Sequence, residues 1–389
     1  MSLTTLLYLM AGWMASYSIP AEDPILRRHD RADERYLALG KEYESSICSV
    51  GGAVGTLIGN QWLLTAGHVV TNISPFSRSA ECGGVSIPIA TVYTYPGWGI
   101  KSDEKGDAID LSIPDLAIVR LAHSPKGMVP MTVSRETNEP GQPIVVVGKG
   151  LTGTGETGPD AEDGKLRAAT NVVDSIFGQY FTFTFSPPGD STATDMEGIG
   201  GPGDSGGPAV VKRNGRNYVI GVSSLNNRGP TGPSTYNSTE VYARVSTSAA
   251  WIDSVIAGKG KADVVTDVVR NLTKEGWPAG VQAAAVKGWI DTFNKQDSVA
   301  IVEFNRQYRT DAALQTTPAE QRVKGSRGLF EQWGPVTMHR YVATPGKPFL
   351  LLVHSSKLDR WISVSFTFEG ERGDKLGRTS IRWPEDPPG

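Results

Sequence analysis

The chain has 389 residues and a formal net charge of −3. This length favours two domains, and so small a charge gives no case for binding nucleic acid or an anionic membrane. The 45 glycines and 25 prolines modestly exceed average usage, as in an all-β protein rich in turns. The five histidines show no metal-ligand spacing and no phosphate-binding loop is present, so we expect no metal and no cofactor.

The N-terminal region begins with an apolar run from Leu6 to Ala15. Its length suits the core of a signal peptide and is too short to span a bilayer. We therefore predict a signal peptide over residues 1–21 and a secreted or periplasmic protein, although no Lys or Arg precedes the run. The alternative is an apolar segment that packs on the protein. Residues 22–44 are charged and should form a helix or a loose lead segment.

One histidine stands where a strand should present its ring. Trp62-Leu63-Leu64 predicts a buried strand, and the small residues Thr65-Ala66-Gly67 follow before His68. Such a strand, ending in a tight turn, would expose the imidazole at its end. The alternative for His68 is a buried core histidine. Four other histidines lack such a setting and should be surface or packing residues: His29, His123, His339 and His354.

An aspartate that could orient this histidine leads the next apolar strand. Asp115 begins Asp115-Leu116-Ala117-Ile118-Val119, and a carboxylate buried there could accept from a neighbouring imidazole N–H. The rivals are Asp103, Asp107 and Asp110, which lie in a polar stretch typical of a solvated loop. Asp110 is the strongest of these rivals, because it also precedes a short apolar segment.

A serine flanked by glycines supplies a candidate nucleophile. Gly203-Asp204-Ser205-Gly206-Gly207-Pro208 is rare by chance, and its small residues would let a carbonyl substrate approach the backbone. Backbone N–H groups around the serine could then donate to an oxyanion. The alternative is a glycine-rich turn between strands.

These three segments, in this order, resemble the chymotrypsin/trypsin-like serine proteases. The separations, 47 residues from His68 to Asp115 and 90 from Asp115 to Ser205, are similar to those of the family. Gly221-Val222-Ser223-Ser224 resembles the strand that lies along the substrate, and residues 241–252 resemble the last barrel strand with the start of the C-terminal helix. The resemblance covers about residues 45–258. It implies two packed antiparallel six-stranded β-barrels with the catalytic residues between them.

The resemblance also implies the role of each site residue. Ser205 would attack the scissile carbonyl, His68 would take and return the proton, and Asp115 would orient His68. The N–H groups of Gly203 and Ser205 would form the oxyanion hole. The expected function is a serine endopeptidase acting on a protein or peptide substrate. The alternative is a non-catalytic binding or adhesion protein on a protease fold.

The sequence departs from many members of the family in its cysteines. Val69 and Ala53 occupy the places where many members have a cysteine pair. Only Cys48 and Cys82 exist in the chain, and we predict that they pair across a separation of 34 residues. The alternative is two separate buried thiols.

A second departure concerns Asp204. In animal relatives, cleavage frees an Ile-Val-Gly-Gly terminus whose amine pairs with this aspartate. The nearest similar string, at Val50, lies only 18 residues before His68. We therefore predict that Asp204 has another partner, such as Arg167, and that no such activation step occurs.

The primary specificity pocket gives conflicting indications. By the resemblance, Ile199 lies at its floor, Ser224 borders the substrate and Glu240 lines a wall. Ile199 favours an apolar side chain in the pocket, whereas Glu240 could accept a basic one. The alternative for Glu240 is an exposed strand residue.

Strands are predicted within the protease region at 143–148, 179–185 and 217–222, with a long surface loop at 150–164. Beyond residue 258 the composition changes. Residues 262–274 and 281–294 have helical spacing, and strand-like runs follow at 337–342, 349–353, 361–368 and 379–383. In the second helix, one face should combine Val281, Ala284, Ala285, Gly288 and Trp289.

We therefore predict a helical linker over 259–280 and an α+β domain over 281–389. This domain is loosely similar to NTF2-like (nuclear transport factor 2-like) domains. It could offer a pocket or partner surface, or serve as a packing appendage, and it shows no catalytic constellation.

Overall fold

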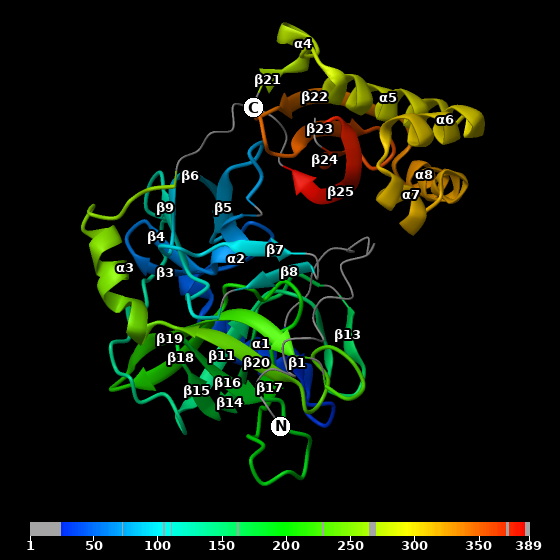
Figure 1. Cartoon of the computed structure of the whole chain (residues 1–389). Coiled ribbons are helices and arrows are strands. Elements are labelled where there is room, and N and C mark those ends of the chain that lie inside the picture. The colour runs from blue at the N-terminus through cyan, green and yellow to red at the C-terminus, as the bar shows by residue number, and fades with distance from the viewer. Residues whose placement is uncertain are drawn as a thin grey trace. The chain divides into compact units, whose positions relative to one another are not determined.

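The structure is a computed structural model that describes residues 25–71, 73–103, 106–109, 111–161, 163–227, 229–263, 270–370 and 373–385 (Figure 1). The predicted signal peptide at 1–21 and the rival Asp110 lie outside these residues. The chain divides into two compact units, which we describe separately. The first comprises residues up to 263 apart from 74–77, and the second comprises 74–77 and residues from 264 onward. Within the described residues, every helix is too short or too polar to cross a bilayer.

The first unit contains a closed barrel of six strands. Their order around the barrel is β2 (Ile47–Val50), β3 (Ala53–Gly59), β4 (Trp62–Thr65), β9 (Ala117–Leu121), β6 (Val85–Thr94) and β5 (Ser79–Cys82). Side chains such as Leu63, Leu64 and Ile118, each 0% exposed, fill the interior. The predicted buried strand before His68 is therefore confirmed. A two-stranded hairpin, β7 (Ile100–Asp103) and β8 (Gly106–Ile109), precedes the segment that carries Asp115.

A second, half-barrel sheet completes the protease architecture. Its main path is β14 (Arg167–Val172), β11 (Pro143–Gly148), β18 (Pro208–Arg213), β19 (Arg216–Asn227), β20 (Thr239–Arg244), β16 (Tyr180–Thr184) and β15 (Ser175–Phe177), and β10 (Thr132–Val133) joins β19. The mainly β class is confirmed, but this sheet has eight strands and does not close like the first barrel. Where the sheet stays open between β14 and β16, the side-chain amide of Asn171 in β14 donates hydrogen bonds to Thr184 O of β16 and to Gly198 O, both at 3.1 Å.

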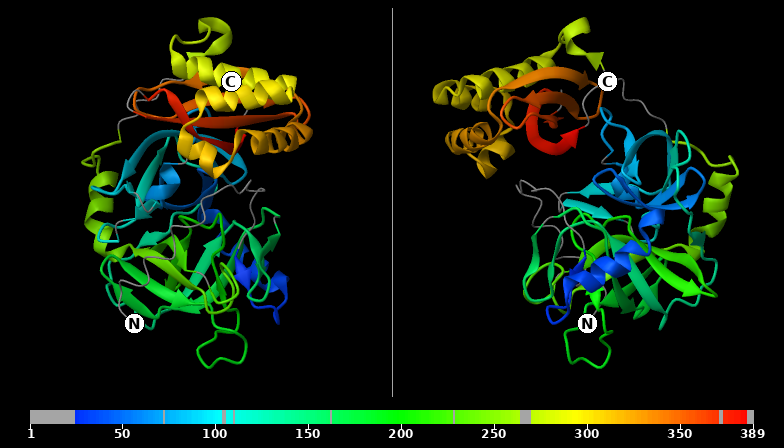
Figure 2. Two further views of the ribbon diagram at one scale, coloured as in Figure 1. Left: turned by 45° about the vertical axis from the view of Figure 1, so that its right-hand side comes forward. Right: turned by 180° about the vertical axis from the view of Figure 1, so that it is seen from behind.

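The charged residues after position 24 are not a loose lead segment. β1 (Leu26–Arg27) pairs with β12 (Thr152–Thr154) and β17 (Gly198–Ile199), and β13 (Gly158–Ala161) completes this small sheet. The predicted surface loop at 150–164 therefore contains two strands. The helix α1 (Asp33–Lys41) lies against β14 (Figure 2). Tyr36 on this helix is 0% exposed and donates its hydroxyl proton to Glu197 O at 3.0 Å.

Short helical segments complete the first unit. They are η3 (Glu44–Ser46), α2 (Gly67–Val70), η4 (Ser246–Ser248) and α3 (Ala249–Ile256). α3 matches the predicted C-terminal helix of the protease region, and its Ile252 and Val255 are fully buried. Trp251 of α3 packs against Tyr95, with ring centroids 5.1 Å apart.

The second unit combines helices with one antiparallel sheet. Its elements are β21 (Arg270–Asn271), α4 (Leu272–Glu275), α5 (Val281–Lys295), α6 (Ser298–Tyr308), α7 (Asp311–Thr316), α8 (Ala319–Trp333), β22 (Val336–Val342), β23 (Phe349–Ser355), β24 (Arg360–Glu369) and β25 (Lys375–Glu385). The strands lie in sequence order in the sheet, and the longer helices cover one of its faces (Figures 1 and 2). The α+β organisation agrees with the sequence, while the NTF2-like resemblance stays a prediction.

Two helix predictions in this unit need correction. The predicted helix over 262–274 is confirmed only at 272–274, which belong to α4. Residues 262–263 are irregular, residues 270–271 form β21, and residues 264–269 lie outside the described residues. α5 was located correctly, but its buried residues are Ala283, Ala285, Val286, Ile290 and Phe293. Of the predicted face, Ala285 is buried and Gly288 and Trp289 are half-buried, whereas Ala284 is exposed and Val281 is 46% exposed.

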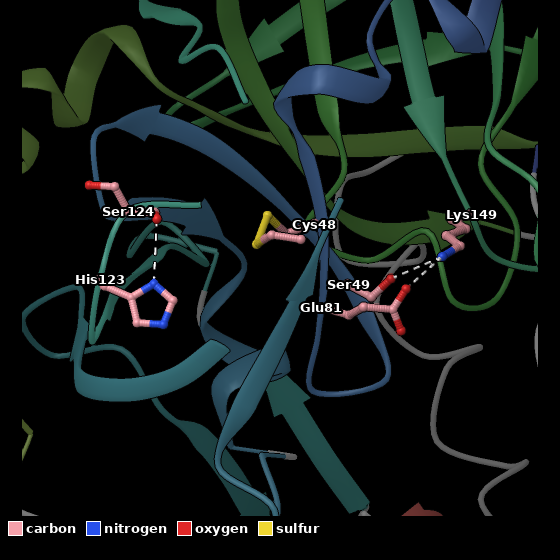
Figure 3. The surroundings of a disulfide bond; sticks show 7 residues. Cys48, Ser49, Glu81, His123, Ser124 and Lys149 are labelled. Atoms are coloured by element: carbon pink, nitrogen blue, oxygen red, sulfur yellow. Dashed lines mark hydrogen bonds and ion pairs between the residues drawn. A yellow bond between two sulfur atoms is a disulfide. The ribbon is translucent and has the colours of Figure 1, made fainter. Parts of the chain in front are cut away.

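The two cysteines form a disulfide bond, as predicted (Figure 3). Cys48 of β2 and Cys82 of β5 stand opposite each other in the barrel, with Cα atoms 4.5 Å apart. Beside the bond, Lys149 Nζ lies 3.5 Å from Ser49 Oγ and 3.9 Å from Glu81 Oε1. The bond therefore links two strands that already pair through their backbones.

Reduction of this disulfide should destabilise the first unit measurably. The 34-residue separation predicts a loss of about 3–4 kcal/mol of unfolding free energy, because the reduced unfolded chain gains conformational entropy. Urea denaturation with and without reductant measures this loss. A variant with alanine at both cysteines is the control and should not respond to reductant. Identical midpoints for oxidised and reduced wild type would contradict the expectation.

Candidate active site

The structure brings His68 and Asp115 into direct contact. His68 lies in α2, the single helical turn that follows β4, and its Nδ1 is 2.6 Å from Asp115 Oδ2. The backbone N–H of His68 also donates to Asp115 Oδ1 at 2.9 Å. Because a carboxylate can only accept, Nδ1 carries the ring proton and Nε2 is left as the acceptor. The imidazole is therefore held in the tautomer that a general base needs.

The carboxylate of Asp115 is fully buried and held by three donors. Ser224 of β19 donates its hydroxyl to Asp115 Oδ2 at 2.7 Å, in addition to the two bonds from His68. The backbone N–H of Asp115 donates to the Tyr180 hydroxyl at 2.9 Å. Asp115 is 0% exposed, whereas the His68 side chain is 19% exposed. The imidazole of His68 is therefore reachable from solvent, and the carboxylate of Asp115 is not.

A close approach by Trp98 explains why glycine precedes the histidine. A Cβ on Gly67 would lie 2.6 and 2.7 Å from two ring carbons of Trp98, and 2.9 Å from Asp115 Oδ1. Real Cβ atoms do not approach heavy atoms so closely. The indole of Trp98 therefore packs directly against Gly67, in the turn that carries His68.

Replacing Gly67 by alanine should disturb the pair directly. The added methyl group must displace the indole or the carboxylate, which should lower the unfolding free energy by about 1–3 kcal/mol and reduce kcat as well. Thermal unfolding and peptide hydrolysis measure the two effects. Gly99→Ala is the matched control, because a Cβ at Gly99 meets nothing within 4 Å. Equal behaviour of the two variants would show that the close packing at Gly67 is unimportant.

Ser205 lies in a tight turn between the two sheets. Its carbonyl accepts from Val54 N of β3 at 2.9 Å, and the next N–H, that of Gly206, donates to Ser223 O at 2.9 Å. Gly206 has a φ of +79°, and a Cβ there would lie 2.2 Å from Thr65 Oγ1. Only glycine allows this approach to the segment that ends in His68. The turn therefore packs against the strand end that presents the histidine.

The backbone around Ser205 leaves two N–H groups available. Gly203 has a φ of +93°, a left-handed conformation that favours glycine and sets the orientation of the peptide groups before Ser205. The Asp204 N–H donates to Gly201 O at 3.1 Å, whereas the N–H groups of Gly203 and Ser205 find no acceptor among the residues that the structure describes. Ser205 is partly exposed, so these donors lie at the surface of the site.

Asp204 is buried and held by backbone donors. Its Oδ2 accepts from Ile25 N at 3.0 Å and from Gly201 N at 2.8 Å, and its Oδ1 accepts from Gly150 N at 2.7 Å. Burial raises the pKa of Asp204 to about 6, although these hydrogen bonds oppose the shift. The predicted partner Arg167 is wrong.

Arg167 is committed to other carboxylates. Its guanidinium contacts Asp33 of α1 at 2.7 Å and Asp163 at 2.7 Å. This pairing holds the pKa of both carboxyls below their usual range. The arginine therefore links α1 to the loop before β14 through two ion pairs, and it does not contact Asp204.

The search for an Ile-led segment missed Ile25. Ile25 stands 43 residues before His68 and is followed by Leu26 and Arg27, so a search for Ile-Val-Gly-Gly passes over it. Ile25 is 1% exposed and Leu26 is 0% exposed. An isoleucine at this distance, followed by a residue able to enter a strand, was the signal that could have found it.

The residues assigned to the primary pocket lie together. Ile199 in β17 is 0% exposed and precedes Gly200, whose N–H donates to Glu240 Oε2 at 2.7 Å. Ser223 donates its hydroxyl to Glu240 Oε1 at 2.9 Å. Glu240 is 2% exposed, so the alternative of an exposed strand residue is wrong. Ser224, which follows Ser223 in β19, is the residue that donates to Asp115.

Comparisons with known proteins agree with this architecture. The chain is similar to chymotrypsin-like elastase family member 1 of Felis catus, with 27% identity over 246 residues, 57% of this chain and 83% of the relative. The protein of that name from Bos taurus is 27% identical over 235 residues, covering 56% and 83%. Serine protease SP24D of Anopheles gambiae is 27% identical over 220 residues, covering 52% and 71%. The sequence profile of the trypsin family matches residues 42–252, more than half of the chain, and the chain therefore belongs to the trypsin family of serine proteases.

Proposed function

We propose that the protein is a serine endopeptidase whose catalytic residues are His68, Asp115 and Ser205. The observation that carries the proposal is the buried Asp115, which accepts from both His68 Nδ1 and Ser224 Oγ. A carboxylate so enclosed stabilises the imidazolium that forms when the ring takes a proton. A binding protein on the same fold would have no need of this arrangement.

The proposed reaction follows the known chemistry of the family. Ser205 Oγ attacks the scissile carbonyl while its proton passes to His68 Nε2, and the carbonyl oxygen becomes an oxyanion between the N–H groups of Gly203 and Ser205. The C–N bond then breaks, the proton on Nε2 goes to the leaving amine, and an acyl-enzyme remains. Water, deprotonated by His68, releases the acid and restores Ser205.

Hydrolysis of a diverse peptide mixture tests this proposal. Wild-type protein should produce new peptide ends at defined sites, and Ser205→Ala should produce none, because it removes only the nucleophile's oxygen. Circular dichroism of the variant shows that the fold is retained. Cleavage by neither folded protein, or by both equally, would contradict the endopeptidase proposal.

We also propose that the protein is exported. The disulfide between Cys48 and Cys82 supports this, since such bonds persist mainly in oxidising compartments. Fractionation of the producing cells, followed by mass spectrometry of the protein's N-terminus, tests the proposal. Recovery in the cytoplasm with both thiols reduced would contradict it.

A further inference from the structure

The segment that carries Asp115 lies outside the strand pairing of the first barrel. Residues 113–116 are irregular, and β9 pairs with its neighbours β4 and β6 only from Ala117 onward. Asp115 is nevertheless fully buried. Because a buried backbone N–H needs an acceptor, that of Asp115 must find one other than the neighbouring strands.

The hydroxyl group of Tyr180 is this acceptor. It accepts from Asp115 N at 2.9 Å and donates to Ile113 O at 2.7 Å. A phenol has one proton and a carbonyl oxygen can only accept, so the direction of both hydrogen bonds is fixed. One hydroxyl group therefore holds two backbone groups of the segment that carries Asp115.

Tyr180 is itself held firmly in the second sheet. It belongs to β16, where its backbone pairs with Ala243 of β20. Its side chain is fully buried, and its ring stacks on that of Phe177 with centroids 5.8 Å apart. The hydroxyl therefore has a fixed position relative to the second sheet.

This position matters because the proposed catalytic residues are divided between the two sheets. His68 and Asp115 lie on segments of the first barrel, whereas Ser205 lies in the turn before β18 of the second sheet. Two side chains of the second sheet bind Asp115: Ser224 binds its carboxylate and Tyr180 binds its backbone. Asp115 is thus fixed at two points relative to the sheet that follows Ser205.

We propose that Tyr180 is a positioning residue that sets the place of Asp115, and through it that of His68, relative to Ser205. This inference rests on the proposed endopeptidase function. Tyr180 takes no part in proton transfer, and its fully buried side chain does not touch the substrate. It acts through geometry, because a displacement of about 1 Å in a catalytic group can lower the rate about 10²-fold.

Tyr180→Phe, which removes only the hydroxyl group, tests the inference by kinetics. It should lower kcat about 10- to 100-fold, because the released segment displaces Asp115 and His68. KM should stay nearly unchanged, since the groups that contact the substrate are untouched. Stopped assays of peptide hydrolysis over a range of substrate concentrations separate the two constants.

Tyr36→Phe is the matched control. Tyr36 is also fully buried, and its hydroxyl likewise accepts from one backbone N–H, that of Arg28 at 3.3 Å, and donates to one carbonyl, Glu197 O at 3.0 Å. The control therefore loses the same kind of hydrogen bonds at a place that does not contact Asp115. It should be destabilised to a similar degree but keep the kcat of wild type.

Proton NMR reports the same geometry without catalysis. The proton between His68 Nδ1 and Asp115 Oδ2, which lie 2.6 Å apart, should resonate far downfield, as expected for a short hydrogen bond to a charged group. This signal should shift upfield or broaden in Tyr180→Phe and stay at its wild-type position in Tyr36→Phe. If Tyr180→Phe does not fold, Phe177→Leu, which removes the ring stacked on Tyr180, should shift the signal in the same direction.

Two results would overturn the inference. One is a downfield signal and a kcat equal to those of wild type in a folded Tyr180→Phe, or an unchanged signal in Phe177→Leu where that variant is needed. The other is an equal loss of kcat in Tyr180→Phe and Tyr36→Phe. If a folded wild type neither reacts with a fluorophosphonate nor cleaves any peptide, it is the endopeptidase proposal that fails.

Discussion

Asp115→Asn should lower kcat about 10⁴-fold while the protein stays folded. An asparagine can present an amide N–H to His68 Nδ1, which favours the wrong tautomer and leaves Nε2 protonated. The size of the effect is taken from trypsin-like proteases, in which the same substitution has been made. Rates of peptide hydrolysis, measured with thermal unfolding curves, give the result.

Ser224→Ala is the matched control for this substitution. It removes one of the three donors to the Asp115 carboxylate but leaves the two bonds from His68 in place. Its loss of kcat should be far smaller, about tenfold or less, since one hydrogen bond to a charged group contributes about 1.5–3 kcal/mol and only part of that acts on catalysis. A loss for Asp115→Asn as small as that for Ser224→Ala would contradict the role given to Asp115.

A chain that starts at Ile25 should be more active than one in which residues 1–24 precede it. Ile25 N already lies 3.0 Å from Asp204 Oδ2, so cleavage before Ile25 would replace a neutral N–H by an ammonium group at that position. The ammonium group would form an ion pair with the carboxylate of Asp204. This ion pair would stabilise the turn that contains Gly203 and Ser205. We expect a gain of about 10²-fold in kcat/KM, similar to that provided by one oxyanion donor.

The same change should alter the dependence of stability on pH. In the longer chain, burial raises the pKa of Asp204 from 3.8 to about 6, so the folded state binds this proton more tightly than the unfolded state does. Stability should therefore fall as the pH rises from about 4 to 6, by up to about 3 kcal/mol. An ammonium group at Ile25 lowers this pKa and should remove most of that fall.

A tag fused directly before Ile25 can be cleaved off to give a protein that starts at Ile25, and this protein is compared with the longer chain. Activity and unfolding free energy are measured from pH 4 to pH 7 for this protein and for the longer chain. Asp204→Asn in the shorter chain is the control and should abolish the gain. Equal activity and equal pH profiles for the two chain lengths would contradict the pairing and support the absence of an activation step.

The candidate site could be predicted from the sequence because its residues lie in local patterns. Three segments, ending in His68, beginning with Asp115 and centred on Ser205, each carry their chemistry within a few residues. The pairing of Cys48 with Cys82 was equally accessible, because the chain contains no other cysteine. The strand at 143–148 was located correctly from its apolar run.

The features that the sequence did not predict depend on contacts between distant segments. The contact between Ile25 N and Asp204 joins residues 179 apart in the chain, and the distance of Ile25 from His68 is its only signal in the sequence. The partner of Arg167 likewise depends on where α1 packs. The sequence predicted a helix as one alternative for residues 22–44, but not the strand β14 that this helix contacts. Glu240 is buried by its pairing with Gly200 and Ser223, so its exposure could not be judged from the strand pattern alone.

The central claim is that Ser205 is a nucleophile activated by His68, and mapping of a fluorophosphonate adduct tests it most directly. After reaction and digestion, mass spectrometry should find one adduct, on the peptide that contains Ser205. Labelling should be absent in Ser205→Ala and strongly slowed in His68→Ala, with both variants folded. An adduct on another residue, or an unchanged labelling rate in His68→Ala, would contradict the claim.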